Sequence, residues 1–445
     1  RHPQVLGQLL GWDVPRAHRE LLEKLALNAL HPSHRFASPV FEPEPISFYT
    51  AQPVGSLVEK SGKSKPGLRN VYALGTVSFL TDVSTEMVLG FLPVYVVQEL
   101  GATRAVLGLM EGLSEFTNYL FRLLSGFLSD RIGRRKPLVF VGYLLSTVAK
   151  PLFAFARTPA DAVAVRVADR VGKGIRTSPR DALLSQSVDE KMAGRAFGLH
   201  RTLDQSGAVL GPLLASALLP LLGPRNVFLL SFVPAALALA VLLLFVVEVG
   251  VERREASVLR GLSKVVKGDF ALLLVAFAVL GLGWYDFSFV LLKSAELGLA
   301  LSMVPLVYLG LNVFHTLVGY PAGVLSDRVG RKPLLALSML LFSAASLAMA
   351  YSAGVWSILY VVALYGLHFG IYETVSRAVI PSYAPPELRG AAYGVFYIVT
   401  GLSMLVGMSL VGYLWDAYGK VLAFTYSAGM GLAAAALAAY LAVKR

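Results

Sequence analysis

Apolar runs long enough to cross a lipid bilayer recur along most of this chain. From Val71 onward, runs of about 20 or more residues follow one another, separated by short polar segments. A helix needs about 20 apolar residues to span the hydrocarbon core of a membrane. Only 15% of the 445 residues are charged, whereas soluble proteins are roughly one-quarter charged. The chain is therefore predicted to fold as an all-α polytopic membrane protein.

Twelve transmembrane helices are predicted, arranged as two pseudo-symmetric six-helix bundles. The predicted spans lie near residues 71–98, 104–127, 137–156, 159–185, 196–223, 226–247, 270–292, 300–325, 333–353, 355–380, 391–415 and 420–443. The predicted domains are a polar N-terminal extension at 1–69, a first bundle at 70–248, a cytoplasmic linker at 249–268 and a second bundle at 269–445. The extension is expected to be mobile, because it is polar and rich in proline.

Lysine and arginine are distributed unevenly between the short loops. Alternate loops carry many cations, whereas the opposite set holds little beyond Arg104, Arg157, Arg225 and Lys420. Excess positive charge marks the cytoplasmic side of a membrane protein. We therefore expect a multi-pass protein of the plasma membrane with both termini in the cytoplasm. The net charge of +12 is explained by this orientation and does not require a nucleic-acid partner.

The two halves of the chain repeat one another. Residues 126–134 read Gly-Phe-Leu-Ser-Asp-Arg-Ile-Gly-Arg, and residues 323–331 read Gly-Val-Leu-Ser-Asp-Arg-Val-Gly-Arg, an offset of 197 (323 − 126). Further glycine pairs recur at an offset of 196. Parallel repeats of this kind place a solute site between the two halves, near the middle of the bilayer.

The duplicated turn resembles the best-known motif of the major facilitator superfamily, whose copies follow the second and the eighth helix. The resemblance implies a transporter in which this motif latches the cytoplasmic side in the outward-open state. The residues that would form this cytoplasmic gate are Gly126, Asp130, Arg131, Gly133, Arg134, Gly323, Asp327, Arg328, Gly330 and Arg331. The alternative is that these cations only orient the chain, although orientation alone does not require an aspartate at a fixed place.

Two further segments refine the resemblance. Residues 79–87 and 174–181 look like a poorly characterised group of prokaryotic permeases within the superfamily. Gly198, Gly207, Gly211 and Pro212 resemble the family's antiporter motif, although Ala215 and Ser216 replace its last glycine pair. The match slightly favours export. A stripe of small residues also lets helices pack closely, so packing alone is an alternative explanation.

Charged side chains within the predicted spans are the candidate substrate or proton sites, because charges at membrane depth are costly. In the fourth span they fall within a wedge of roughly 140° at about 3.6 residues per turn, so this face is expected to turn away from lipid. The candidates are Asp82, Glu86, Glu111, Glu115, Arg166, Arg170, Lys173, Arg176, Asp286, His315 and Glu373.

Two interpretations compete for these residues. Most are expected to pair with one another, with Asp82, Glu86 or Glu115 neutralising Arg170, Lys173 or Arg176. A minority would bind substrate or carry a proton, since a buried carboxyl group or a histidine can load and release one near neutral pH. The arginines favour an organic anion as substrate and the carboxylates favour a cation. The sequence leaves this choice open.

The predicted function is a proton-coupled secondary transporter for a small solute, acting as a monomer, with export slightly favoured. The alternatives are a non-transporting receptor or sensor on the same scaffold, and an uptake permease for an organic anion. The sequence contains no cysteine and no phosphate-binding loop of the Gly-x4-Gly-Lys-Ser/Thr type. ATP-driven transport is therefore not expected. The sequence also shows no metal-ligand cluster and no convincing nucleophile–base motif, so we expect no enzyme activity, no cofactor and no metal.

Overall fold

A computed structural model describes residues 67–189, 192–250, 265–385 and 388–444, and every regular element within these ranges is helical. The predicted N-terminal extension lies outside the described residues except for 67–69, and the predicted linker except for 249–250 and 265–268. The first half below means the described residues up to 250, and the second half means those from 265 onward.

The helices of the first half begin and end as follows: α3 (Leu68–Leu89), α4 (Leu92–Val94), the π-helical turn η1 (Tyr95–Glu99), α5 (Arg104–Ile132), α6 (Lys136–Ala149), the 3-10 segment η2 (Lys150–Phe155), α7 (Pro159–Ser187), α8 (Ala193–Leu230) and α9 (Phe232–Phe245). Those of the second half are α11 (Gly268–Leu282), α12 (Phe287–Glu296), α13 (Val304–Val329), α14 (Arg331–Tyr351), α15 (Ser357–Val379), the 3-10 segment η4 (Ile380–Tyr383) and α16 (Arg389–Val443).

Seven helical segments of the described chain are long and apolar enough to cross a bilayer. Two of them, Ala193–Phe245 and Arg389–Val443, contain 53 and 55 residues, more than twice the roughly 20 needed for one crossing. Each is divided by a glycine with a positive φ angle, Gly223 at 72° and Gly419 at 85°. The count of twelve spans in two bundles remains a prediction.

The segments Leu68–Glu99 and Gly268–Glu296, which match the first and seventh predicted spans, are each interrupted within their length. Helix α3 ends at Leu89, and a Cβ atom on the following Gly90 would lie 3.0 Å from the Cβ of Pro305 in the second half. The equivalent helix of the second half is interrupted between Leu282 and Phe287. The first interruption lies within an apolar run, so hydropathy does not reveal it, whereas the second contains Gly283 and Asp286.

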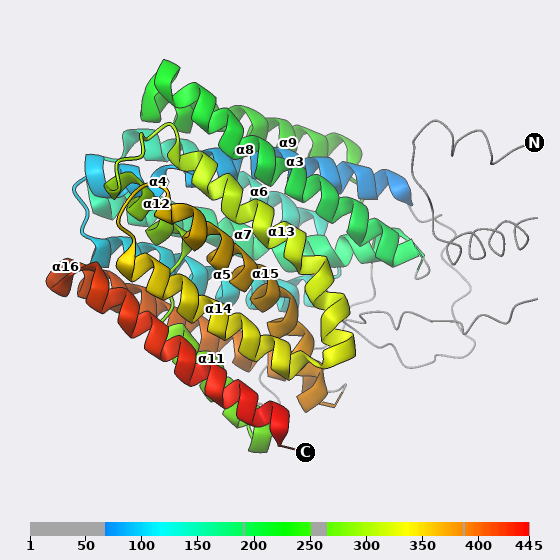
Figure 1. Cartoon of the computed structure of the whole chain (residues 1–445). Helices are drawn as coiled ribbons and strands as arrows, with labels where there is room; N and C mark the ends of the chain where they lie inside the picture. The colour runs from blue at the N-terminus through cyan, green and yellow to red at the C-terminus, as the bar shows by residue number, and fades with distance from the viewer. Residues whose placement is uncertain (1–66, 190–191, 251–264, 386–387, 445) are drawn as a thin grey trace, which may run out of the picture. The chain divides into compact units, whose positions relative to one another are not determined.

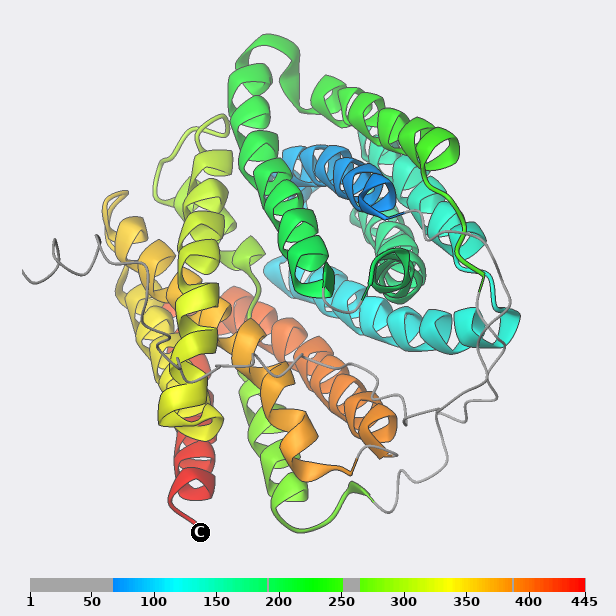
Figure 2. The same ribbon diagram turned by 90° about the vertical axis from the view of Figure 1, so that its right-hand side faces the viewer.

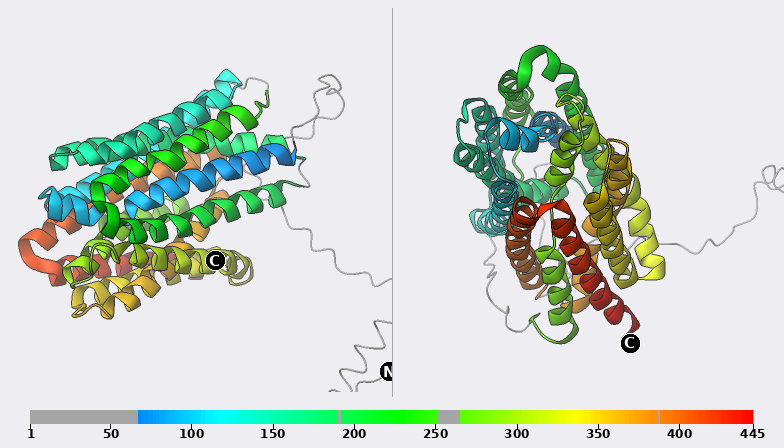
Figure 3. Two further views of the ribbon diagram at one scale, coloured as in Figure 1. Left: turned by 90° about the horizontal axis from the view of Figure 1, so that it is seen from above. Right: turned by 60° about the vertical axis from the view of Figure 1, so that its left-hand side comes forward.

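Corresponding helices pack in corresponding ways in the two halves. Helix α3 packs against α8 and its repeat equivalent α11 against α16, while α5 packs against α7 and α13 against α15. The halves meet where α5 packs against α16 and α8 against α13. Figure 1 shows α8 running beside α13, and in Figure 2 the cyan helix α5 lies beside the orange first part of α16. The long helices run roughly side by side when seen from above (Figure 3).

Hydrogen bonds between helices of the same half stabilise one end of the bundle. At the turn end, which carries the duplicated turn and faces the viewer in Figure 2, Asn70 donates to Ser187 and to the carbonyl of Val247. Lys136 donates to the carbonyl of Val246 at 2.6 Å, and its repeat equivalent Lys332 donates to the carbonyl of Leu441 at 3.0 Å. The opposite end, where α5 begins, is called the Arg104 end.

Large apolar side chains cover the outside of several helices. Leu221, Leu244, Tyr320 and Val443 are between 72 and 83% exposed. Apolar surface on this scale would promote aggregation in water but is stable against lipid tails. The exposed apolar surface and the seven apolar segments identify a multi-pass membrane protein.

Candidate functional site

The most deeply buried ion pair of the described residues joins α5 to α7. Arg166 donates from Nε at 3.1 Å and from Nη2 at 2.6 Å to Oε2 of Glu111, and both side chains are 1% exposed. Asp169 lies 3.7 Å from Nη1 of Arg166. Oε1 of Glu111 and Nη1 of Arg166 have no hydrogen-bond partner within the described ranges. The pair is a desolvated cross-link between two helices.

One turn further along, Glu115 and Arg170 form a longer pair at 3.9 Å. Asn118 donates to Glu115 at 3.4 Å. Gly174 allows this approach, because a Cβ atom there would lie 2.8 Å from the carbonyl oxygen of Asn118 on α5. The pairing of Glu115 with Arg170 is one of those considered from the sequence.

Arg176 and Lys173 differ in their surroundings. Arg176 donates to the hydroxyl of Ser146 at 2.6 Å and lies 4.5 Å from the ring centre of Tyr143, so it has a hydroxyl and an aromatic face in place of a carboxylate. The ammonium of Lys173 makes no hydrogen bond or ion pair among the described residues. The charges of Glu115, Asp82 and Glu86 nevertheless act on it.

Lys150 is a buried cation that the sequence analysis overlooked. It is 1% exposed and donates to the hydroxyl of Thr85 at 3.1 Å. The signal in the sequence was a single lysine within the third apolar run, beside Pro151, where α6 gives way to a 3-10 segment.

Asp82 and Glu86 share one face of α3, as predicted, and this face packs against the glycines of α8. A Cβ atom on Gly207 would lie 3.0 Å from the Cβ of Asp82, and one on Gly211 would lie 2.7 Å from the Cβ of Glu86. Glu86 also lies beside Tyr308 of the second half. Two glycines of the antiporter-like motif therefore hold both carboxyl groups against α8.

A single methyl group tests this packing. Gly211→Ala is expected to destabilise the protein by about 1–3 kcal/mol, because the new methyl overlaps Glu86 and the carbonyl oxygen of Val83. Gly198→Ala on the same helix is the matched control, since nothing lies within 4 Å of its added Cβ atom. Thermal unfolding of the purified protein in detergent measures both. Equal midpoints for the two variants would contradict a packing role for Gly211.

In the second half, His315 of α13 and Glu373 of α15 form a hydrogen-bonded pair. Nε2 of His315 lies 2.7 Å from Oε2 of Glu373, and Arg377 donates to Oε1 of Glu373 at 2.6 Å. Arg201 of the first half lies 3.9 Å from the same Glu373. This cluster joins two of the predicted candidates and adds Arg377 and Arg201. Arg201 was missed although its predicted span also carries His200 and Asp204, which could have drawn attention to it.

Asp286 lies at the interruption after α11. Its carboxylate accepts from the backbone N–H of Phe287 at 2.7 Å and from the hydroxyl of Ser288 at 3.3 Å, so it caps α12. Across the boundary between the halves, Glu111 and Arg166 are among the charges that act on it. Helix capping explains this residue without a ligand.

At the Arg104 end, ionic contacts join the two halves. Arg104 donates from Nε to Glu296 at 3.0 Å and from Nη1 to Asp416 at 3.0 Å. Asp416 also accepts the backbone N–H groups of Arg104 and Ala105 at 3.2 and 2.8 Å, so it caps the N-terminus of α5. The guanidinium lies 5.1 Å from the ring centre of Trp415. We call Arg104, Glu296, Asp416 and Trp415 the Arg104 cluster, and the sequence analysis did not find it.

At the turn end, the ion pairs of the duplicated turn stay within one half. Asp130 pairs with Arg135 at 3.2 Å, and Asp327 lies 3.9 Å from Arg331. The backbone N–H groups of Arg135 and Lys136, at the start of α6, donate to the carboxylate of Glu248 at 2.9–3.2 Å and not to Asp130. The partners Arg135 and Glu248 were not among the predicted gate residues.

Inside the bundle, charged side chains are more exposed nearer the turn end, although the charged residues of the Arg104 cluster are themselves 21–31% exposed. Glu111 and Arg166, nearer the Arg104 end, are 1% exposed, whereas Arg377 and Asp181 are 33 and 35% exposed. Arg201 is 55% exposed. The charged side chains inside the bundle are thus buried nearer the Arg104 end and partly exposed nearer the turn end.

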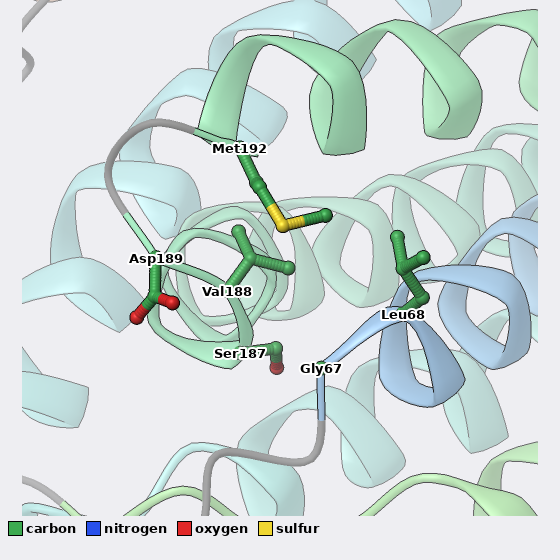
Figure 4. A pocket seen from close by; sticks show the side chains of 6 residues that line it. All are labelled: Gly67, Leu68, Ser187, Val188, Asp189 and Met192. Carbon is green, nitrogen blue, oxygen red and sulfur yellow. The ribbon is translucent and has the colours of Figure 1, made fainter.

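A hollow of about 530 Å³ lies at the turn end, away from these ionic groups. It is lined by Gly67, Leu68, Ser187, Val188, Asp189 and Met192 (Figure 4). A second hollow, of about 480 Å³, lies beside Gly330 and Arg331. Both are hollows at helix ends, so neither is taken as the solute site. No group of three or more histidine or acidic side chains suited to a metal ion occurs among the described residues.

Comparison with known proteins identifies relatives of the whole hydrophobic region. The sequence profile of the Major Facilitator Superfamily matches residues 74–313 and 271–445. An uncharacterised MFS-type transporter of Methanocaldococcus jannaschii is 32% identical over 370 residues, which cover 80% of this chain and 92% of that protein. The multidrug resistance protein MdtH of Aeromonas hydrophila is 33% identical over 147 residues, covering 32% of this chain and 37% of that protein.

Among solved structures, a variant of the nucleoside transporter NupG superposes with a TM-score of 0.74 at 14% sequence identity. The match covers 83% of this chain and 99% of that one. At this identity the likeness concerns the fold alone.

Proposed function

The chain belongs to the major facilitator superfamily, and from that premise we propose that it is a monomeric secondary transporter which moves a small solute by alternating access, driven by protons. Membership of a transporter family, a multi-pass helical fold and the relation to a transporter of Methanocaldococcus jannaschii support the general class. The coupling to protons, the direction of transport and the nature of the solute are further parts of the proposal. The proposed bundles are residues 70–248 and 269–445.

One observation carries the proposal, namely the different states of the two ends. Arg104, Glu296 and Asp416 hold the halves together at one end, while charged side chains near the other end are exposed by up to 55%. A site between two repeats that is closed on one side and accessible on the other is what alternating access requires.

We assign the turn end to the cytoplasm, which places both termini there and makes this conformation inward-open. The duplicated turn then forms the gate that closes in the opposite state. In the inward-open state its aspartates are free to pair locally, as Asp130 does with Arg135. The protein is assigned to the plasma membrane.

Protons and direction are inferred from the interior of the first half. Asp82 and Glu86 are carboxyl groups that have no ion pair within 4 Å among the described residues, and a carboxyl group in such a setting is a suitable proton carrier. Export is favoured because Gly207 and Gly211 match the antiporter motif, and because part of the chain is similar to the multidrug resistance protein MdtH.

Replacing the two gate aspartates tests the role of the duplicated turn. Asp130→Asn and Asp327→Asn together are expected to slow transport by roughly 5–150-fold, since a gate contact biases a two-state equilibrium by about 1–3 kcal/mol. Their side chains are 25 and 73% exposed, so stability should change little. Accumulation assays in cells and thermal unfolding measure the two effects. Unchanged accumulation would favour the sensor over the transporter.

The proposed function is tested in proteoliposomes with an imposed pH gradient and a pH-sensitive dye inside. A panel of organic anions, organic cations, nucleosides and drugs is added in turn. Proton movement that follows addition of one of these compounds, and that is absent from protein-free vesicles, is the expected result. Solute movement without protons would reject the coupling, and no movement of any compound in the panel would reject the transporter.

A further inference from the structure

Glu86 of α3 and Arg170 of α7 carry opposite charges and lie near each other in the interior without touching. The charge of Arg170 is among those that act on Glu86, yet the two side chains form no ion pair, so their charged atoms lie more than 4 Å apart. Oε2 of Glu86 and Nε of Arg170 are both buried and have no hydrogen-bond partner among the described residues. One acceptor and one donor are therefore left unused beside the same gap.

The packing of the first half holds the two groups against different neighbours. Glu86 lies against α8, where a Cβ atom on Gly211 would be 2.7 Å from the Cβ of Glu86. Arg170 is 3% exposed, and its Nη1 is directed to Glu115 of α5 at 3.9 Å. Buried charged groups that stay unpartnered are costly, so a gap between two of them needs an explanation.

Tyr308 of α13 borders this gap from the second half. Its side chain is 6% exposed, and Glu86 and Arg170 are among the groups that act on its hydroxyl. Its ring is stacked on that of Phe287, with ring centres 4.6 Å apart, so Tyr308 is held by its own half. A solute in the gap would contact both halves, which is where a site between two repeats is expected. We call Glu86, Arg170 and Tyr308 the Glu86–Arg170 site.

Charges of both signs surround the Glu86–Arg170 site and limit what it can hold. A purely cationic solute would partner Glu86 but leave Nε of Arg170 unused and add positive charge beside it. A purely anionic solute would partner Arg170 and be repelled by Glu86. A solute with one charge of each sign partners both atoms and adds no net charge to a desolvated interior, where an unpaired charge is costly. The other charged groups that act on the two residues are Lys173, Arg166, Glu115, Asp169 and Glu111.

We propose that the protein binds amphoteric solutes, compounds that carry both an amine and a carboxylate, at the Glu86–Arg170 site. The inference rests on the proposed transport function and names its class of solute. The carboxylate accepts a hydrogen bond from Nε of Arg170, and the ammonium donates to Oε2 of Glu86. The hydroxyl of Tyr308 contacts the solute from the second half. Arginines and carboxylates then occur together in the interior because the solute requires both.

Matched compounds of one series test the requirement for two charges. The series is the ω-amino acids from glycine to aminohexanoate, each also as its amide, which keeps only the amine charge, and as its N-acetyl form, which keeps only the carboxylate. Binding is measured from the rise of the thermal unfolding midpoint with ligand concentration. At least one chain length is expected to bind. Its amide and N-acetyl forms should bind more weakly by roughly tenfold or more, since each leaves a buried charged group unpartnered.

Two variants assign each charge of the solute to its residue. In E86Q the amino acid should lose its advantage over the N-acetyl form and keep its advantage over the amide. In R170Q the advantage over the amide should be lost and that over the N-acetyl form kept. R170K, which also lacks the planar Nε donor, replaces R170Q if that variant does not elute as a single species. E99Q and R157Q change exposed residues and are the matched controls, which should keep both advantages.

The outcomes separate this inference from the proposed function. If no chain length binds better than both of its singly charged forms, or if both advantages persist in E86Q and in R170Q, the assignment of amphoteric solutes is wrong. Proton-linked flux of a singly charged compound in vesicles, without binding of any amphoteric one, overturns this inference alone. Binding of an amphoteric compound that shows no flux, in a protein that moves no other compound, overturns the transport function alone.

Discussion

Arg166→Met is expected to destabilise the protein by about 3–5 kcal/mol, the cost of leaving one charge of a buried ion pair without its partner. The change leaves Glu111, which is 1% exposed, with no cation at 2.6 Å. Asp169, which lies 3.7 Å from Arg166, loses a cationic neighbour as well. Unfolding of the purified protein by denaturant in mixed micelles measures the loss.

A second change separates loss of the pair from loss of packing. The double variant R166M/E111Q removes both charges and should recover most of the stability, because a neutral pair of similar volume leaves no buried charge. Arg131→Met is the matched control, since Arg131 is exposed at the turn end and should change stability by no more than about 0.5 kcal/mol. Equal stability of R166M and R131M would show that the ion pair contributes nothing.

Arg104→Ala is expected to open the Arg104 end. The change removes the charged contacts to Glu296 and Asp416 and the stacking on Trp415. Arg104 is 31% exposed, so each contact contributes only a modest stabilisation. Together their loss is expected to shift the equilibrium between the closed and open states of this end by about 1–3 kcal/mol, or 5–150-fold. Spin labels on Ala160→Cys and Ala353→Cys, one in each half, measure the separation at this end.

Two controls make this result specific to the ion pairs. Arg225 is an exposed arginine of α8 just after Gly223. Arg225→Ala should leave the distance between the two labels unchanged. The charge exchange R104D/D416R restores an opposite-charge pair across the halves and should return part of the closed population. If R104A and R225A gave the same distances, the Arg104 cluster would not be a gate.

Much of the fold could be predicted from the sequence, because a helix that crosses lipid must present a long run of apolar residues. Apolar runs located the helices, and the wedge of charges in α7 correctly predicted a face turned away from lipid. Arg166, Asp169, Arg170 and Arg176 are all no more than 5% exposed. Periodicity within one helix is a local property, so a sequence alone can reveal it.

Contacts between helices that are far apart in the sequence could not be predicted from it. Arg104 and Asp416 are separated by 312 residues, and each had the appearance of an ordinary loop charge. Asp204 became a partner of Asp82 only because Gly207 brings α8 close to α3. The close approach of Gly90 to Pro305 of the other half was hidden for the same reason. The pairing of Asp130 with Arg135 was likewise set by the geometry of the turn.

The most direct test of alternating access is to measure both ends of one protein. In R104A the distance between labels at positions 160 and 353 should lengthen. The distance between labels on Ser185→Cys in α7 and Ser382→Cys in η4, both exposed near the turn end, should shorten in the same proportion of molecules. Opposite changes of this kind follow if the two bundles rock about a site between them. If both distances lengthen together, or if the turn end does not respond, the two ends are not alternately closed and the account is wrong.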